Sequence, residues 1–233
     1  MKKRTFYTEA AYVCGILILA LGTALMERAD FGVSMVVAPA YLIHLKVSQV
    51  LPFFSFGMAE YSLQAVVLIL LAVILRRFRI SYLFSFVTAV LYGLALDGFI
   101  LLIALFPAEA LAVRLAFFVL GMLCCALGVS LFFHTYISPE AYELFVKECS
   151  ARFGIEISRF KTGYDCVSCL IGVILSFCFF GWLHFEGVKL GTIFCALVNG
   201  RIIGLISHAL ENRFTFSDGL KLRRYFENTQ TAE

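Results

Sequence analysis

The chain has 233 residues, of which 61% are hydrophobic and only 15% are charged, and its formal net charge is +3 at pH 7. Soluble domains are closer to half apolar and about a quarter charged. These values and a mean hydropathy of +0.92 exclude an ordinary soluble protein, a disordered chain and a nucleic-acid-binding protein, and they indicate a protein that crosses a membrane several times.

Six apolar stretches approach the roughly 20 residues that a helix needs to cross the hydrocarbon core. They predict spans at about residues 10–26, 55–75, 80–105, 115–133, 164–183 and 190–210. The basic start of the chain resembles a signal peptide, but no convincing small-residue cleavage site follows it. We therefore expect the first stretch to be a retained span, and we predict an all-α membrane protein with six transmembrane helices.

The segment after the first span is too apolar for an exposed loop, since Lys46 is its only charge between residues 32 and 54. Gly32 suits a tight turn, and Ser34 suits the cap of a short helix. Such pieces are tolerated at membrane depth only where they are buried in protein or line a wet cavity. We expect a short helix or re-entrant segment here.

The segment after the fourth span has the same character. Ser138, Pro139 and Glu140 form a typical helix start, with a cap, a proline at the first position and an acid in the first turn. They predict an amphipathic helix over residues 139–153. Each half of the chain is therefore expected to follow its first span with a turn and a short helix.

The two halves resemble each other in sequence. Residues 15–25 (GILILALGTAL) align with residues 121–131 (GMLCCALGVSL) at a separation of 106, with six of the eleven positions identical. Each half holds three spans, an odd number, so the second half must insert upside down. This predicts two inverted repeats, over 8–105 and 112–210, as is common among secondary transporters. The repeats form a single membrane domain over 1–233 whose end, 211–233, is a basic cytoplasmic tail.

The basic residues predict the orientation. The loops expected on one side hold fourteen: Lys2, Lys3, Arg4, Arg76, Arg77, Arg79, Lys147, Arg152, Arg159, Lys161, Arg213, Lys221, Arg223 and Arg224. The other side holds four: Arg28, Lys46, Arg114 and Lys189. Because cytoplasmic loops are enriched in lysine and arginine, both termini are expected in the cytoplasm.

Several short elements resemble those of the YczE/YitT-type bacterial membrane proteins. They are Arg28-Ala-Asp-Phe-Gly-Val-Ser34, Ser138-Pro-Glu-Ala141, Gly163-Tyr-Asp165 and the segment 191–200 (GTIFCALVNG). The resemblance covers about residues 8 to 210 and rests on the order and spacing of these elements. The chain departs from the pattern at Met35, where the family often has proline. The resemblance implies a bacterial plasma-membrane location and no particular substrate.

Two charges lie inside expected spans, Asp97 in the third and Arg201 in the sixth. A lone charge at that depth costs roughly 2.5–3.5 kcal/mol, so we expect the two to be paired. They either flank a polar midplane cavity lined by Asn199 and Tyr92, or form a fixed ion pair that locks the two halves together.

The other candidate site residues lie near span ends. Glu60 and Asp165 are either first-turn acids at positive helix ends or, if they face the core, proton or cation sites. Arg28, Asp30 and Ser34 at the outer turn are either cap or interfacial residues or parts of a gate or binding loop. His134 and Glu140 at the inner turn have the same alternatives as Glu60 and Asp165, and His134 marks either the interface or a proton relay.

No catalytic or phosphate-binding motif appears, so we expect no enzyme and no cofactor or metal site. We expect a small-solute transporter or solute-binding membrane protein with a polar site between the halves. The alternative is a non-transporting partner, either a substrate-binding subunit of a larger transporter or a regulator. The expected partners are the lipid bilayer and an unidentified solute or ion, with no nucleic acid. The sequence leaves a homodimer open.

Overall fold

The computed structural model describes residues 4–181 and 187–220. Its elements are β1 (Arg4–Tyr7), α1 (Thr8–Ala29), α2 (Ala38–Val47), α3 (Phe56–Leu75), α4 (Ile80–Ile103), α5 (Leu111–Phe133), α6 (Ala141–Phe153), α7 (Ile157–Phe180), α8 (Leu190–Arg213) and β2 (Phe214–Ser217). Six helices are long and apolar enough to cross a membrane, namely α1, α3, α4, α5, α7 and α8. The chain is a multi-pass membrane protein, as predicted.

The start of the fifth span differs most from the prediction. We expected it at residue 164, but α7 begins at Ile157. Lys161, which we had assigned to a cytoplasmic loop, therefore lies inside the helix with 3% of its surface exposed. Its charge ended the apolar stretch in the sequence, whereas in the structure acidic partners allow it to be buried.

Both predicted short helices are present, but each begins later than expected. Ser138 does not cap α6, because Glu140 occupies the N-cap position and no side chain caps the helix. Ser34 does not cap α2 either; its carbonyl accepts hydrogen bonds from the backbone of Val37 and Ala38 in the turn before the helix. In each half, an irregular turn thus precedes the short helix and enters the core.

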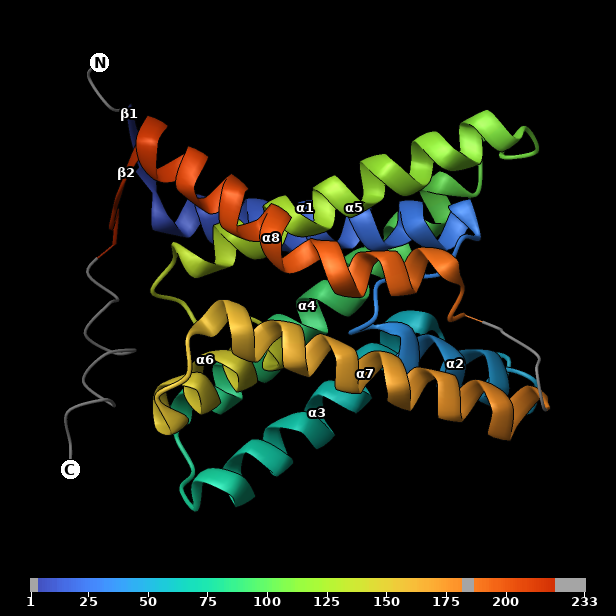
Figure 1. The fold of residues 1–233 in the computed structure, drawn as a ribbon, viewed down its shortest axis with the longest axis horizontal. Helices are drawn as coiled ribbons and strands as arrows, with labels where there is room; N and C mark the ends of the chain where they lie inside the picture. Colours follow the sequence, from blue (N-terminus) through green and yellow to red (C-terminus); the bar gives the residue numbers. More distant parts are fainter. Residues whose placement is uncertain (1–3, 182–186, 221–233) are drawn as a thin grey trace.

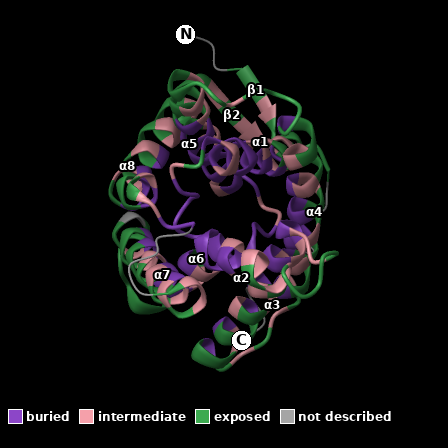
Figure 2. Cartoon of the chain, turned by 90° about the vertical axis from the view of Figure 1, so that its right-hand side faces the viewer, coloured by how far each residue is buried: buried purple, intermediate pink, exposed green. Residues whose placement is uncertain are grey.

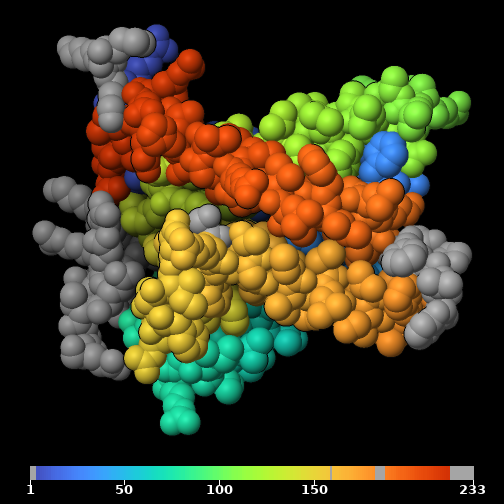
Figure 3. Space-filling model, in the orientation of Figure 1, coloured from blue at the N-terminus to red at the C-terminus, as the bar shows by residue number. Residues whose placement is uncertain are grey.

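The helices pack in two groups (Figure 1). In one, α1 lies along α5, with α4 packed on α1 and α8 on α5. In the other, α2 packs against α3 and α7, and α6 against α3 and α7; α3–α4 and α7–α8 contacts join the groups. From the same side, the space-filling view shows α5 and α8 in the upper part of the molecule and α6, α7 and α3 in the lower part (Figure 3). Buried residues gather toward the interior, and exposed ones cover the outer helix faces (Figure 2).

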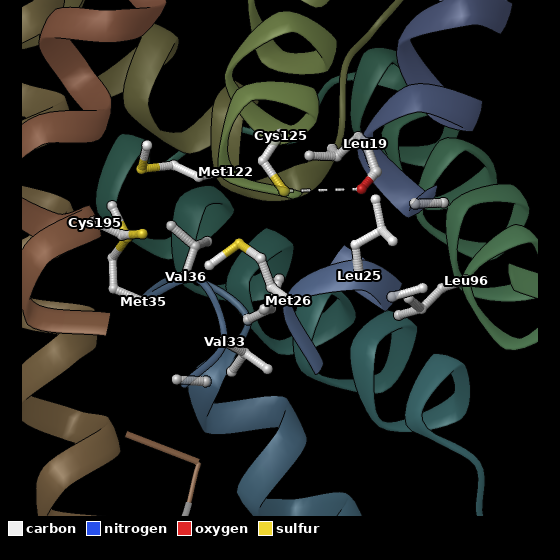
Figure 4. Close-up of a cluster of buried hydrophobic side chains, with 14 of the residues drawn as sticks. Leu19, Leu25, Met26, Val33, Met35, Val36, Leu96, Met122, Cys125 and Cys195 are labelled. Carbon is white, nitrogen blue, oxygen red and sulfur yellow. Dashed lines mark hydrogen bonds between the residues drawn. The ribbon is translucent and has the colours of Figure 1, made fainter. Parts of the chain in front are cut away.

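Glycines allow α1 and α5 to cross closely. A Cβ atom added to Gly22 would lie 2.7 Å from the carbonyl oxygen of Gly121, and one added to Gly121 would lie 2.7 Å from that of Gly22. About one turn further along the crossing, the Cys125 Sγ lies 4.0 Å from the Leu19 carbonyl oxygen (Figure 4). Small residues at such crossings let backbones approach, and van der Waals packing then holds the helices together in lipid.

Two short strands join the ends of the described chain. β1 pairs with β2 in parallel, from Arg4 opposite Phe214 to Tyr7 opposite Ser217. The Glu9 carboxylate accepts hydrogen bonds from the backbone N–H groups of Gly219 and Leu220. No pattern in the sequence predicted these strands. They fix the first part of the expected tail beside α1; the rest of that tail, with Lys221, Arg223 and Arg224, lies outside the described residues.

The glycine crossing is tested by Gly22→Ala. The added methyl group has no room beside Gly121 and Cys125, so we expect a loss of about 1–3 kcal/mol in stability, seen as a lower melting temperature in detergent. Gly98→Ala is the matched control, because a Cβ at Gly98 meets nothing within 4 Å. Equal melting temperatures for the two variants would contradict the close crossing.

Candidate functional site

Four carboxylates are buried together in the interior. Glu60 and Asp165 are 0% exposed, Glu140 is 1% exposed and Glu143 is 3% exposed. Glu60 comes from α3, Glu140 and Glu143 from the start of α6, and Asp165 from α7. With Lys161 and Gln64, they form what we call the acidic cluster. So many acids rarely share a buried site without a functional reason.

Lys161 holds two of these acids. Its Nζ lies 2.9 Å from Oδ1 of Asp165, one turn further along α7, and 3.8 Å from Oε1 of Glu143. It is the one buried lysine or arginine among the described residues. A buried cation is tolerated only when it is paired, so Lys161 and its acids depend on each other.

Gln64 connects the remaining two acids. Its Nε2 donates to Glu140 Oε2 at 2.9 Å and to Glu60 Oε2 at 3.4 Å. Its Oε1 accepts from the Ala141 backbone N–H at 3.0 Å, and the Tyr142 hydroxyl donates to Glu60 at 3.1 Å. These bonds attach the start of α6 to α3 and satisfy one oxygen of each of the two acids.

Other polar atoms in this region have no protein partner. They include one oxygen each of Glu60, Glu140 and Glu143, Oδ2 of Asp165 and Oδ1 of Asn199. Unsatisfied buried acceptors are rare in proteins, and here they are acceptors for protons, water or a cation.

A small cavity adjoins the cluster where the two groups of helices meet. Its volume is about 30 Å³, which is room for roughly two waters. It is lined by Leu19, Thr23, Ser34, Val36, Val37, Tyr92, Cys125, Val129, Glu140, Tyr142, Glu143, Lys161 and Asn199. The apolar part of this wall is drawn in Figure 4, with Leu19, Val36 and Cys125. The cavity thus has an acidic side and an apolar side.

Burial shifts the proton affinity of the acids that lie outside the membrane-spanning helices. The pKa of Glu140 is raised well above its ordinary value, first by desolvation and then by the nearby charges of Glu143 and Glu60. The pKa of Glu143 is also raised by desolvation, although Lys161 opposes the change. These carboxyl groups therefore hold protons at a higher pH than exposed acids do.

The structure brings three of the predicted site residues into the cluster. Glu60 and Asp165 face the interior, as the core-facing alternative predicts, and Glu140 lines the cavity. Tyr92 and Asn199 also line the cavity, and the Tyr92 hydroxyl lies 2.9 Å from Thr23 Oγ1. Ser34 belongs to the same wall.

The expected pair of Asp97 and Arg201 is wrong. Asp97 accepts hydrogen bonds from the Ser55 hydroxyl at 2.6 Å and from the Gly57 backbone N–H at 2.8 Å, so it stabilises the start of α3. Arg201 is exposed on α8. The carboxylate thus reaches the positive end of a neighbouring helix instead of the guanidinium.

The outer-turn residues form a surface network. Asp30, 62% exposed on its side chain, pairs with Arg114 at 3.0 Å and with Lys189. Arg28 donates to the carbonyl oxygen of Phe106 at 3.0 Å. These contacts join the end of α1 to the starts of α5 and α8, and they favour the interfacial interpretation of Arg28 and Asp30.

His134 lies at the inner turn beside α8. Its Nε2 lies 2.8 Å from the Ser207 hydroxyl and 4.0 Å from Glu211, and its ring stacks on Phe216 at 4.4 Å. Desolvation lowers its pKa. This packing also favours an interfacial role, apart from the acidic cluster.

Sequence reasoning missed Lys161, Glu143 and Gln64. Lys161 and Asp165 are four residues apart and therefore share one helix face, a spacing that was visible in the sequence. Gln64 and Glu60 share the same spacing on α3. A search for acid–base and amide–acid pairs at this interval, extended beyond the apolar cores of the spans, would have found both.

In the described parts of the chain, no group of three or more His, Cys, Asp or Glu is arranged to hold a metal ion.

Most of the chain matches the model of one protein family. The model of a family described as "Family of unknown function (DUF6198)" matches residues 6–208. No curated protein and no solved structure matches the chain. The acidic cluster, Tyr92 and Asn199 all fall within the matched residues.

The dependence of the acids on Lys161 is tested by Lys161→Met. It leaves Asp165 and Glu143 buried without a cation, so we expect a loss of about 3–5 kcal/mol in stability. Lys161→Met combined with Asp165→Asn should recover part of this loss in thermal unfolding. Arg159→Met, which removes an 83% exposed cation from the same helix, should change little. Equal losses for both single variants would contradict the buried pair.

The raised pKa values predict that stability falls as the pH rises. The ordinary value for both acids is 4.5, so above it the folded state holds protons that the unfolded chain has lost. The stability that these protons contribute is then fully present below that value and is lost as the pH rises through the pKa of the folded state.

Several polar groups from neighbouring helices surround Glu140. They are Glu143 and Tyr142 of α6, Glu60 and Gln64 of α3, Lys161 of α7, Tyr12 of α1, Tyr92 of α4 and Cys125 of α5.

We therefore expect the melting temperature to fall as the pH rises above 4.5, the ordinary pKa of a glutamate, and Glu140→Gln to make this fall shallower. Thermal unfolding over a pH series measures both. Glu109→Gln, which changes an exposed acid, should retain the wild-type slope. A wild-type slope in Glu140→Gln would show that this carboxyl group does not carry the effect.

Proposed function

Since the chain belongs to the DUF6198 family, whose function is unknown, we propose a function from its own geometry: a secondary transporter that exchanges a small cationic solute against protons. The observation that carries this proposal is the acidic cluster, in which four carboxylates and a single lysine are buried beside an internal cavity. Ionisable groups inside membrane proteins commonly mark the paths of substrates and protons.

The charge of the cluster indicates the class of solute. If all four acids are ionised, Lys161 compensates only one of them, and the field in the cavity is negative. An anionic solute would add repulsion, whereas a cation or protons would neutralise the acids. Because both bind to the same oxygens, a cation displaces protons, and this competition provides the coupling.

We propose that the protein consists of two inverted repeats, with the cavity between them. Leu19 and Cys125 are 106 residues apart, the separation found in the sequence, and they contact each other at the crossing of α1 and α5. Gly22 packs on Gly121 on one side of this contact, and Gly15 packs on Gly128 on the other. A two-fold axis relates such contacts. If a residue of one half touches a residue of the other half, the counterparts of the two residues must touch as well.

Hydrogen bonds across the halves support the same relation. The Ser85 hydroxyl of α4 donates to the carbonyl oxygen of Pro139, and the Thr192 hydroxyl of α8 donates to that of Val33 at 2.8 Å. Ser85 and Thr192 are 107 residues apart, and Val33 and Pro139 are 106 apart. Each half thus holds the irregular turn of the other, so a rocking motion of one half would move both turns.

For the orientation, we propose a bacterial plasma membrane with both termini in the cytoplasm. The support is the excess of lysine and arginine on one set of loops. The alternative function, a non-transporting partner of another membrane protein, predicts that the purified chain moves no solute by itself.

Transport is tested in proteoliposomes loaded with a pH-sensitive dye. Gradients of ammonium, guanidinium, tetramethylammonium or putrescine chloride are applied, and proton flux is recorded. We expect at least one cation to drive protons the opposite way, and Glu140→Gln to reduce this flux about tenfold or more, which corresponds to about 1.4 kcal/mol.

Glu109→Gln should transport like the wild type, and Asp165→Asn provides a second cluster variant if Glu140→Gln folds poorly. Wild-type flux no greater than that of empty liposomes for all four cations would overturn the proposal. Flux that is unchanged in both cluster variants would remove the cluster from the transport path.

A further inference from the structure

A surface groove runs along α3 and α4 at the end where the two helices are joined. Its volume is about 620 Å³, and its apolar wall includes Leu68, Ile69, Ala72 and Val73 of α3 and Leu83 and Phe86 of α4. Ile69 and Val73 are 66% and 67% exposed. This side of the bundle is where α3 diverges from its neighbours (Figure 1).

Arginines line the part of this groove next to the turn between α3 and α4. Arg76 and Arg77 belong to its wall and also to that of an adjoining pocket of about 280 Å³, which is completed by Leu75 and Arg152. The groove therefore continues directly from an apolar surface into a pocket with three guanidinium groups. Arg152 comes from the last turn of α6, so two separate parts of the chain build the pocket.

One acid is placed beside these cations. Glu148 of α6 pairs with Arg77 at 3.1 Å and with Arg79 at 3.2 Å. This carboxylate orients Arg77 and links α6 to the α3–α4 turn, but it compensates only one positive charge. Arg76 and Arg152 add further positive charge to the same pocket, which is thus complementary to an anion.

We propose that this combined site holds one anionic phospholipid, with an acyl chain in the α3–α4 groove and its phosphate at Arg76, Arg77 and Arg152. Guanidinium groups bind phosphate oxygens through paired N–H donors. Basic pockets beside spans recognise anionic lipid heads on the cytoplasmic side. A free anion would use only the pocket, and an ordinary boundary lipid only the groove. This inference does not rest on the transport proposal.

The bound lipid has a structural consequence. The α3–α4 turn is attached to α6 by Glu148, and α6 begins in the acidic cluster. A phosphate that binds both Arg76 and Arg152 would hold the turn and α6 together from outside, on the same element that carries Glu140 and Glu143. Lipid composition would then affect the stability of this part of the protein.

Native mass spectrometry of the detergent-purified full chain tests the proposal. The protein is titrated with dioleoyl phosphatidylglycerol or, separately, dioleoyl phosphatidylcholine. We expect one phosphatidylglycerol molecule to be retained with roughly tenfold higher affinity than phosphatidylcholine, and Arg76→Gln combined with Arg152→Gln to abolish this preference. Two Arg→Gln changes remove charge without removing apolar contacts.

Two further arms separate the groove from the pocket. Val73→Trp fills the groove at an exposed position and should reduce retention of both lipids, while glycerol 3-phosphate, which has the charge without the chain, should fail to displace the bound lipid. Arg159→Gln combined with Arg213→Gln, which changes two exposed arginines on α7 and α8, is the charge-matched control and should bind like the wild type. Equal affinity for the two lipids, or a preference that persists in the double variant, would overturn the proposal.

Discussion

The ion pair of Lys161 and Asp165 is the interaction on which the centre of this protein depends. The ammonium and the carboxylate are 2.9 Å apart and almost entirely removed from solvent. Either charge alone would be costly at that place, and replacing such a pair by apolar residues is often neutral or stabilising. Its presence is therefore better explained by a need for charge beside the cavity than by a need for stability.

The pair also determines how the neighbouring acids behave. Lys161 reaches Glu143 as well, so one cation is shared between α7 and α6. Glu140 and Glu60 lie beyond its direct contacts and are joined through the amide of Gln64. An amide can serve two carboxyl groups of different protonation state, because it donates to charged and neutral oxygens alike. Glu60 and Glu140 can thus gain or lose a proton while the hydrogen bonds from Gln64 stay in place.

The sequence predicted the spans well, because a helix in lipid must satisfy its backbone internally and be apolar over most of its length. It predicted charged contacts poorly. Asp97 and Arg201 were paired because both lie deep in counterpart spans, but depth does not determine which way a side chain points. Asp97 points to the start of α3, and Arg201 lies on an exposed face. The β1–β2 pairing was missed because it joins segments about 210 residues apart, which no local pattern reveals.

Positions that are 106 residues apart share the glycines of the helix crossing but not the charged residues of the acidic cluster. Gly15 and Gly22 correspond to Gly121 and Gly128, so the close crossing is repeated in sequence. The counterparts of Glu140 and Lys161 are Ser34 and Ser55, and neither of those can carry the same charge. In the proposed inverted repeats, the packing residues are thus shared and the charges are not. In the transporter that we propose, two halves with the same packing would have two alternative tilts, and a cluster in one half would give the two states different affinities for protons. That difference is what a transporter needs to couple a solute to a gradient.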